Sequence, residues 1–252
     1  MSDSYAYGDC DAAADRLDLV ARAFEATTRS FLQRDGAPAP AVAIDLGCGP
    51  GNTTRLIAET LSPSHISGLD GSAAFVERAR RGSPAGVTFQ EHDVRKVPLP
   101  SAPADLIFTR LLLSHLPDPP AMVARWGTQL RAGGRLLLDE VEDITADEPT
   151  LRRYLALTRA IVRRTGAELF VGPALVRMQA PAGLRRHAST VAKFALPTGT
   201  AARIFGMNLA VLTDLGAVEG QDALAAELAT LADGAAPGTT TWRVRQIAFR
   251  VS

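Results

Sequence analysis

The stretch that most constrains the fold of this chain is residues 42–52, which read VAIDLGCGPGN. A short apolar run contains Asp45 near its end and is followed by glycines at alternate positions, Gly47, Gly49 and Gly51. The next segment, 53–61, has helical spacing of its apolar residues. A strand, a glycine-rich turn and a helix in this order form a nucleotide-binding corner. Glycines let the backbone turn tightly beside a ligand, and the helix start offers unpaired N–H groups.

Composition narrows the class of protein. The 252 residues fit one large domain, or one domain with an added subdomain. Lys+Arg and Asp+Glu number 27 each, so a net charge of +0 gives no long-range attraction to nucleic acid or acidic lipid. Cys10 and Cys48 are too few for a disulfide framework, and the four histidines lack metal-ligand spacing. Without a signal-peptide core or an apolar run of ~18 residues, we expect a cytoplasmic protein with no metal, nucleic-acid or membrane partner.

Apolar runs alternate with amphipathic helical segments along the chain. The runs expected to be strands are the one at 42–46 and those at 65–70, 87–93, 104–110, 135–141, 186–196 and 242–251. Strands that are apolar on both faces and separated by helices indicate a sheet covered on both sides. We therefore predict an α/β fold, a seven-stranded mostly parallel sheet with helices on both faces.

The chain organisation adds two features to this sheet. Residues 1–36 are expected to form an N-terminal helical cap, and residues 37–252 one domain with a helical insertion after the fifth strand, at about 143–184. Substrate identity is expected to lie within about 143–215. This range carries apolar bulk that could line a pocket or build the subdomain's own core, at Tyr154, Phe170, Met178, Phe194, Phe205 and Met207.

Two ligand chemistries compete for the glycine-rich corner. A nicotinamide dinucleotide site wants G-x-G-x-x-G and an acid about twenty residues later. Asp70 supplies that acid, but the glycines here follow G-x-G-x-G. Asp45 would also lie beside a pyrophosphate, where like charges repel. A ligand with an ammonium or sulfonium group suits that carboxylate better.

At this point the sequence resembles class I S-adenosylmethionine-dependent methyltransferases of the small-molecule type. Residues 42–51 are similar to the first motif of that family, GLDGS at 68–72 to its second acidic site, and EHDV at 91–94 to its adenine-binding strand end. Residues 105–117 and 130–136 resemble its fourth-strand motif and its approach to strand five. Together these motifs cover about residues 42–141 and imply a Rossmann-like methyltransferase fold.

The resemblance implies a role for each matching residue. Asp45 would organise the methionine moiety, with Gly47, Gly49 and Gly51 making room for it. Asp70, followed by Gly71, would accept both ribose hydroxyls, and Asp93 with the Val94 amide would bind adenine. Arg110 would contribute its carbonyl near the methionine amine, and Tyr7 and Arg16 would hold the methionine carboxylate. Each role has an alternative interpretation. The glycines could form only a tight turn, Asp70 and Asp93 could be ordinary helix caps, and Tyr7 and Arg16 could be surface residues.

A general base matters for methyl transfer only if the acceptor must lose a proton, as a hydroxyl usually does. The catalytic candidate is His115, after the fourth strand, with Asp139 and Glu140 as further candidates; His115 could instead pack or cap a turn. We predict methyl transfer from S-adenosylmethionine to a small molecule, as O-methylation of a secondary metabolite. The alternatives are N- or C-methylation, another reaction or no catalysis on the bound cofactor, and NAD-dependent oxidoreduction. Whether the protein is a monomer or a homodimer stays open.

Overall fold

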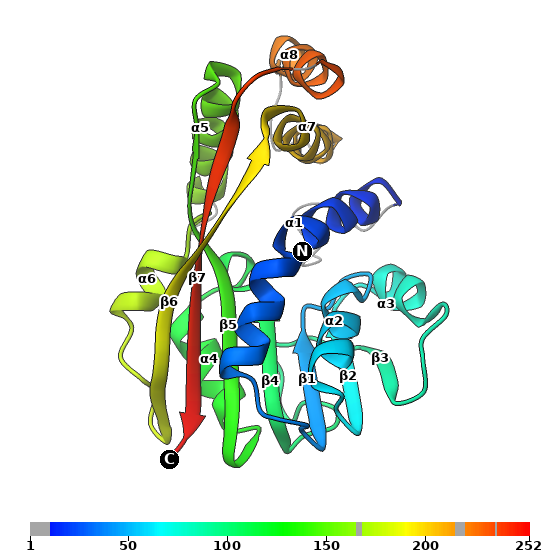
Figure 1. Ribbon diagram of the computed structural model, residues 1–252, viewed down its shortest axis with the longest axis vertical. Helices are drawn as coiled ribbons and strands as arrows, with labels where there is room; N and C mark the ends of the chain where they lie inside the picture. The colour runs from blue at the N-terminus through cyan, green and yellow to red at the C-terminus, as the bar shows by residue number, and fades with distance from the viewer. Residues whose placement is uncertain (1–10, 165–167, 215–219, 235) are drawn as a thin grey trace.

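The computed structural model describes residues 11–164, 168–214, 220–234 and 236–252. Its sheet has seven strands in the order β3-β2-β1-β4-β5-β7-β6. The strands are β1 (Val42–Leu46), β2 (His65–Asp70), β3 (Val87–Glu91), β4 (Ala104–Arg110), β5 (Leu130–Ala146), β6 (Leu184–Pro197) and β7 (Thr239–Val251). Neighbours from β3 to β5 pair in parallel, while β7 runs antiparallel to both β5 and β6. The predicted seven-stranded, mostly parallel sheet is confirmed (Figure 1).

Helices cover both faces of this sheet. The helices α1 (Asp11–Asp35), α2 (Asn52–Leu61) and α3 (Ala73–Arg80) pack on one face over Ala43, Leu106 and Phe108. The helices α4 (Pro119–Gly127) and α6 (Gly172–Arg177) pack on the other face over Ile44 and Ile107. Because side chains alternate along a strand, odd and even positions of β1 reach different helices. This alternation decides where the polar residues of the strand ends point.

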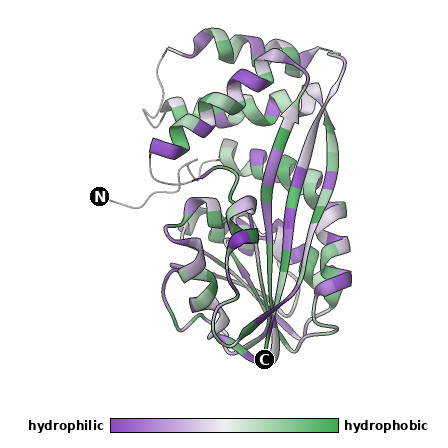
Figure 2. Ribbon diagram, turned by 90° about the vertical axis from the view of Figure 1, so that its left-hand side faces the viewer, coloured by the Kyte–Doolittle hydropathy of each residue, from purple (hydrophilic) through white to green (hydrophobic). Residues whose placement is uncertain are grey.

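The last three strands in sheet order extend beyond the others. β5, β7 and β6 run upward from the sheet to the helices α5 (Pro149–Arg164), α7 (Thr198–Asp214) and α8 (Asp222–Asp233), which we call the upper helical layer (Figures 1 and 2). These elements share a core with Phe24 of α1. Its aromatic rings are in contact, with Phe24 4.9 Å from Phe194 and Phe194 stacked on Trp242 at 5.8 Å. The upper layer is therefore a second packed body built on the ends of the long strands.

The largest differences from the prediction concern β3, β5 and the expected insertion. β3 ends at Glu91, so Asp93 lies in the following turn rather than in the strand. β5 covers 17 residues and reaches Ala146, beyond the expected 135–141. The region expected as an insertion holds α5 and α6, but the helices that α5 packs against, α7 and α8, come later in the chain. Hydrophobic periodicity detects that an element exists and is a weaker guide to where it ends.

None of the helices among the described residues combines the length and apolar character needed to cross a membrane.

Between β4 and α4, the chain makes a 3-10 turn, η1 (Leu113–His115), that carries the candidate base His115. This turn follows the carboxyl end of β4, where ligands bind in parallel sheets.

Candidate functional site

The conformation of the glycine-rich loop between β1 and α2 requires glycine at two positions. Gly47 and Gly49 have φ angles of +69° and +52°, a region that side chains with a Cβ rarely adopt. A Cβ on Gly47 would lie 2.9 Å from Leu112 Cδ1, which is closer than real contacts allow. The loop is anchored to β2, because the N–H groups of Gly47 and Cys48 both donate to the carbonyl of Leu69, at 2.8 and 3.1 Å. The result is a rigid backbone surface at the carboxyl end of β1.

Asp45 lies behind this loop and is almost fully buried. One carboxylate oxygen accepts a hydrogen bond of 2.6 Å from the Thr54 hydroxyl of α2. Burial raises the pKa of Asp45 to about 7, although Thr54 and the nearby Arg110 charge act in the opposite direction. A buried carboxyl with a pKa near neutrality is ready to ionise when a cation is brought beside it.

Asp70 connects the end of β2 to the glycine-rich loop. One of its oxygens accepts from the Gly49 N–H at 2.8 Å, and the other accepts from the Ser72 N–H at 2.9 Å. These two bonds orient the carboxylate, and a carboxylate has about four lone-pair positions in all. No atom of the described residues lies within 4 Å of the position that a Cβ on the neighbouring Gly71 would take.

The two candidate adenine-binding residues lie in the turn after β3. Asp93 is held by Arg95, whose Nε donates to it at 2.8 Å and whose backbone N–H donates at 3.0 Å. The Arg95 side chain is the main reason why the pKa of Asp93 lies below its usual range. Val94 is buried, and its carbonyl accepts 2.8 Å from the Trp126 indole. This turn lies beside Asp70, since the His92 N–H donates to the Asp70 carbonyl at 2.8 Å.

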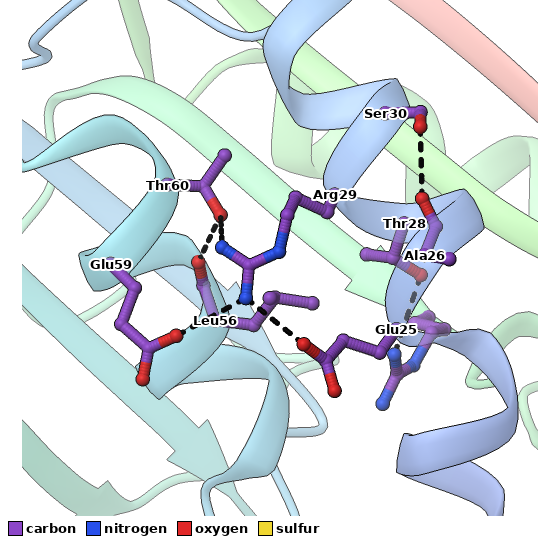
Figure 3. Close-up of polar contacts among 9 residues, drawn as sticks. Glu25, Ala26, Thr28, Arg29, Ser30, Leu56, Glu59 and Thr60 are labelled. Carbon is purple, nitrogen blue, oxygen red and sulfur yellow. Dashed lines mark hydrogen bonds and ion pairs between the residues drawn. The ribbon is translucent and has the colours of Figure 1, made fainter.

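The first part of α1 covers the loop. Leu17 Cδ1 would be 3.4 Å from a Cβ on Gly49, and the Asn52 amide at the start of α2 donates to Asp18 at 2.7 Å. Farther along α1, Arg29 donates to Glu25 of its own helix and to Thr60 and Glu59 of α2 (Figure 3). These pairs are exposed and contribute little stability individually, but they fix how α1 rests on α2.

A cleft of about 390 Å³ opens between α1 and α2. The cleft is lined by Arg110 of β4 and by Glu25 and Glu59, the two acids that form ion pairs with Arg29. The lining residues carry both signs of charge: Asp18, Ala21, Arg22, Glu25, Asn52, Arg55, Leu56, Glu59 and Arg110. The cleft therefore borders the glycine-rich corner on the side of α1 without a bias toward anions or cations.

A buried polar chain lies beneath α1 on the same face of the sheet as Asp45. Arg110 of β4 donates 3.3 Å to the Thr28 hydroxyl, which in turn donates 2.7 Å to Asp139 of β5. Gln246 of β7 donates to the other oxygen of Asp139 at 3.2 Å. Asp139 is fully buried, so these bonds satisfy a group that would otherwise be costly to bury. Its geometry assigns Asp139 to the support of α1, away from the loop after β4.

Glu140, the next residue of β5, points to the opposite face. One of its oxygens accepts from the backbone N–H groups of Leu112 and Leu113, each at 2.9 Å. Burial raises the pKa of Glu140 to about 8, against the effect of these two donors. Glu140 thus holds the turn η1 that presents His115. Burial, with a smaller effect of the Arg16 charge, lowers the pKa of His115 to about 4, so the imidazole is neutral at pH 7 and only weakly basic.

Arg16 points toward the upper helical layer, where its guanidinium donates to the Asn208 side chain of α7. It is 5% exposed and its charge acts on both His115 and Tyr154 of α5. Tyr7, the other predicted contact of the methionine carboxylate, lies outside the described residues. Sequence reasoning missed Asn208 as a partner of Arg16, because 192 positions separate them and no local pattern links them.

The aromatic residues expected near the substrate pack mainly within the upper layer. Tyr154 stacks on Phe205 at 4.4 Å between ring centroids, and Phe205 lies 6.2 Å from Trp242. Phe170 is buried and lies under Arg159 at 5.5 Å. The core interpretation of these residues therefore holds for Tyr154 and Phe205. Among the described residues, no three His, Cys, Asp or Glu side chains are grouped as metal ligands would be.

Comparisons with known proteins agree with this geometry. Residues 43–134 match the family described as a methyltransferase domain. A trans-aconitate 2-methyltransferase from Methylobacterium nodulans is 32% identical over 164 residues, which are 65% of this chain and 58% of that protein. A 37.1 kDa protein of transposon TN4556 from Streptomyces fradiae, described as uncharacterized, is 35% identical over 162 residues, 62% of this chain and 44% of that protein. The chain thus spans about half the length of the curated relatives that it matches.

The likeness of the fold extends over almost the whole chain. The crystal structure of geranyl diphosphate C-methyltransferase from Streptomyces coelicolor A3(2) has a TM-score of 0.56 at 15% identity, covering 98% of this chain and 87% of that one. At this identity the likeness concerns the fold alone. The match to the family model, at residues 43–134, includes the glycine-rich corner, and the fold of the whole chain agrees with it. Residues 43–134 therefore form a methyltransferase domain, and the chain has the Rossmann-like fold of class I S-adenosylmethionine-dependent methyltransferases.

Proposed function

We propose that this protein transfers the methyl group of S-adenosylmethionine to an oxygen atom of a small-molecule acceptor in secondary metabolism. The observation that carries the proposal is the hydrogen bond that the Gly49 N–H donates to the Asp70 carboxylate, at the same strand ends as the buried Asp45. This joins a carboxylate able to accept ribose hydroxyls to a second carboxyl suited to a cationic amino-acid group. The positive φ angles of the loop glycines leave its backbone open to close approach by such a ligand.

Each described residue of the corner has a role in this proposal. Asp45 would face the methionine ammonium, Asp70 the ribose and Asp93 with Val94 the adenine. The carbonyl of Arg110 would lie near the methionine amine, as the family resemblance implies, because Arg110 ends β4 and β4 pairs in parallel with β1. When bound, S-adenosylmethionine supplies a methyl group on a positively charged sulfur. The chain's own part is to bind and align both partners, since alignment alone is worth large factors in rate.

The relatives suggest which acceptor to test. Relatives named trans-aconitate 2-methyltransferase make trans-aconitate the first compound to test. The acceptor atom is open to the same test, because a protein of similar fold is a C-methyltransferase. N- or C-methylation, another reaction on the bound cofactor, and binding without catalysis are the alternatives. An NAD-dependent oxidoreductase is a further alternative, and it predicts binding of the dinucleotide in the same corner.

Two measurements test the proposal in sequence. Calorimetry with S-adenosylmethionine and S-adenosylhomocysteine is expected to give binding that Asp70→Ala abolishes and that Glu77→Ala, an exposed change on α3, leaves intact. Methyl-labelled cofactor is then offered with trans-aconitate, benzoate, phenols, alcohols and amines, and labelled products are separated. Cofactor binding that is absent, or unaffected by Asp70→Ala, would overturn the site. Binding with no methylated product would leave the noncatalytic alternative.

A further inference from the structure

The cleft between α1 and α2 is a second enclosed space beside the glycine-rich corner. Its volume of about 390 Å³ lies in the range of small-molecule sites, about 300–1,000 Å³. Gly47, Gly49, Asp70 and Asp93, to which we give roles in cofactor binding, are not among its lining residues. The cleft therefore offers room for a ligand other than the cofactor.

Two contacts between α1 and α2 hold the walls of this cleft in place. The Asn52 amide of α2 donates to Asp18 of α1 at 2.7 Å. Seven positions later on each helix, Arg29 forms ion pairs with Glu25 of α1 at 3.1 Å and with Glu59 of α2 at 3.3 Å (Figure 3). Seven residues correspond to about 10 Å along a helix. The lining residues of each helix thus lie on a short segment that is fastened at both ends.

The charges of the lining residues are balanced in number, but their partners are not. The acids have cationic partners outside the lining: Arg29 pairs with both Glu25 and Glu59, and Arg78 of α3 lies 4.0 Å from Asp18. Within the part of the chain that the structure describes, no ion pair joins a lining arginine to a carboxylate. These arginines are Arg22, Arg55 and Arg110. The charge that lacks a close counterion in the cleft is therefore positive.

Arg110 supplies the innermost of these charges, at the end of β4. Its guanidinium donates to the Thr28 hydroxyl at 3.3 Å, which uses one of five N–H donors, and lies 5.7 Å from the centre of the Phe24 ring. Burial lowers the pKa of Arg110, although the Asp139 and Asp45 charges act to raise it. The two acids therefore offset only part of the cost of burying this cation, and an anion in the cleft would offset more of it.

The other two arginines line the cleft nearer the surface. Arg55 donates to the carbonyls of Pro50 and Ala79 at 2.9 and 2.7 Å, and its guanidinium lies 5.5 Å from the centre of the Phe89 ring. These partners are neutral, so they fix the position of the Arg55 side chain and leave its charge in place. Arg22 lies between Asp18 and Glu25 on α1 and is exposed, so its long side chain is free to adjust to a ligand.

Guanidinium groups bind the oxygens of carboxylates and phosphates, commonly two at a time. Several guanidinium groups around one small space favour a ligand with more than one such group. We propose that the cleft between α1 and α2 binds a small molecule with two or more oxyanion groups. Arg110 holds one group at the inner end, and Arg22 with Arg55 holds another nearer the surface. This site does not depend on the proposed methyl transfer.

The test is calorimetry on the full chain at neutral pH. Succinate and citrate are the carboxylate probes, pyrophosphate is the phosphate probe, and acetate and succinamide are the singly charged and neutral comparisons. At least one multiply charged probe is expected to bind about tenfold or more tightly than acetate and succinamide, the effect of one further charge-assisted hydrogen bond. Comparison of citrate and succinate with pyrophosphate shows whether carboxylates or phosphates are preferred.

Three variants locate the binding. Arg22→Gln removes an exposed charge, and Arg110→Gln removes the inner one; each is expected to weaken binding about tenfold or more. Arg177→Gln is the matched control, because it removes one exposed positive charge from α6 on the opposite face of the sheet and is expected to leave binding unchanged. Circular dichroism checks that each variant is folded. Because Arg22 is exposed, its variant keeps the test decisive if Arg110→Gln fails to fold.

Several results would overturn the proposal. Multiply charged probes that bind no better than acetate and succinamide would remove the site, as would unchanged affinity in a folded Arg22→Gln or Arg110→Gln. The titrations are repeated with saturating S-adenosylhomocysteine, and binding is expected to persist. Complete loss of binding under that condition would assign these arginines to the cofactor site. Absence of S-adenosylhomocysteine binding would count against the proposed function alone, because the first titrations contain no cofactor.

Discussion

Replacing Asp45 by asparagine tests the chemical argument for a cationic ligand at the glycine-rich corner. The carboxyl is buried and accepts a hydrogen bond from Thr54, and its pKa is raised from 3.8 to about 7. A change of this size corresponds to about 4 kcal/mol against the ionised form in the free protein. If the methionine ammonium requires the ionised carboxylate, cofactor binding must include the loss of a proton from Asp45 whenever the pH is below about 7.

The magnitude follows from the fraction of Asp45 that is ionised. With a pKa of about 7, lowering the pH from 8 to 6 is expected to weaken cofactor affinity roughly tenfold. Binding at pH 6 is expected to release close to one proton, whereas binding at pH 8 releases almost none. The free protein responds in the opposite sense: a raised carboxyl pKa gives stability that is present below about pH 4 and is lost as the pH rises through about 7.

Calorimetry of S-adenosylhomocysteine binding in two buffers of different ionisation enthalpy measures the released proton directly. Asp45→Asn is expected to bind more weakly at pH 8 and to lose both the proton release and the pH dependence. Thr54→Val keeps the carboxyl but removes the hydrogen bond that lowers its pKa, so the transition is expected to move to higher pH. Proton release that persists unchanged in Asp45→Asn would refute the reasoning, since another group would then be titrating.

Three further predictions concern the loop and the turn after β4. Gly47→Ala is expected to lose ~1–2 kcal/mol or more of unfolding free energy in denaturant titrations, because its φ is +69° and its Cβ would meet Leu112, while Gly71→Ala in open space changes little. His115→Gln is expected to change the rate of methyl transfer less than ~tenfold, with no inflection near pH 6.5; a loss of ~10²–10⁴ would restore the general-base role. Glu140→Leu is expected to destabilise the fold by ~1–3 kcal/mol or more, because one buried and one partly buried N–H group lose their acceptor, and Glu140→Gln is expected to cost less, again by denaturant titration.

The half of the fold that carries the glycine-rich corner could be predicted closely from the sequence. Strands there are short, apolar on both faces and bounded by turns, so each is found from a few residues, and the acids at positions 45 and 70 identify strand ends. The same reasoning extended the third strand to Asp93, although the strand ends at Glu91. Whether a polar residue continues a strand or begins the following turn depends on pairing with the neighbouring strand, which local sequence does not encode.

The polar residues after β4 and β5 show a different limit. Asp139 and Glu140 are adjacent in sequence and both are candidate bases, yet alternation along a strand directs them to opposite faces of the sheet. That alternation was available from the sequence, but the partners were not: Thr28 and Gln246 for Asp139, and the backbone of η1 for Glu140. Both carboxyls therefore have structural partners that only the tertiary fold brings to them.

Helix α1 contacts both the glycine-rich loop and the upper helical layer, through residues that are consecutive in the sequence. Leu17 lies against Gly49 of the glycine-rich loop, while Arg16, one position earlier and about 100° around the helix, reaches Asn208 of the upper layer. Arg29 fastens the same helix to α2, and Thr28 fastens it to β5. Because these contacts join residues that are far apart in the sequence, the position of α1 over the loop depends on the tertiary fold, which no local pattern encodes.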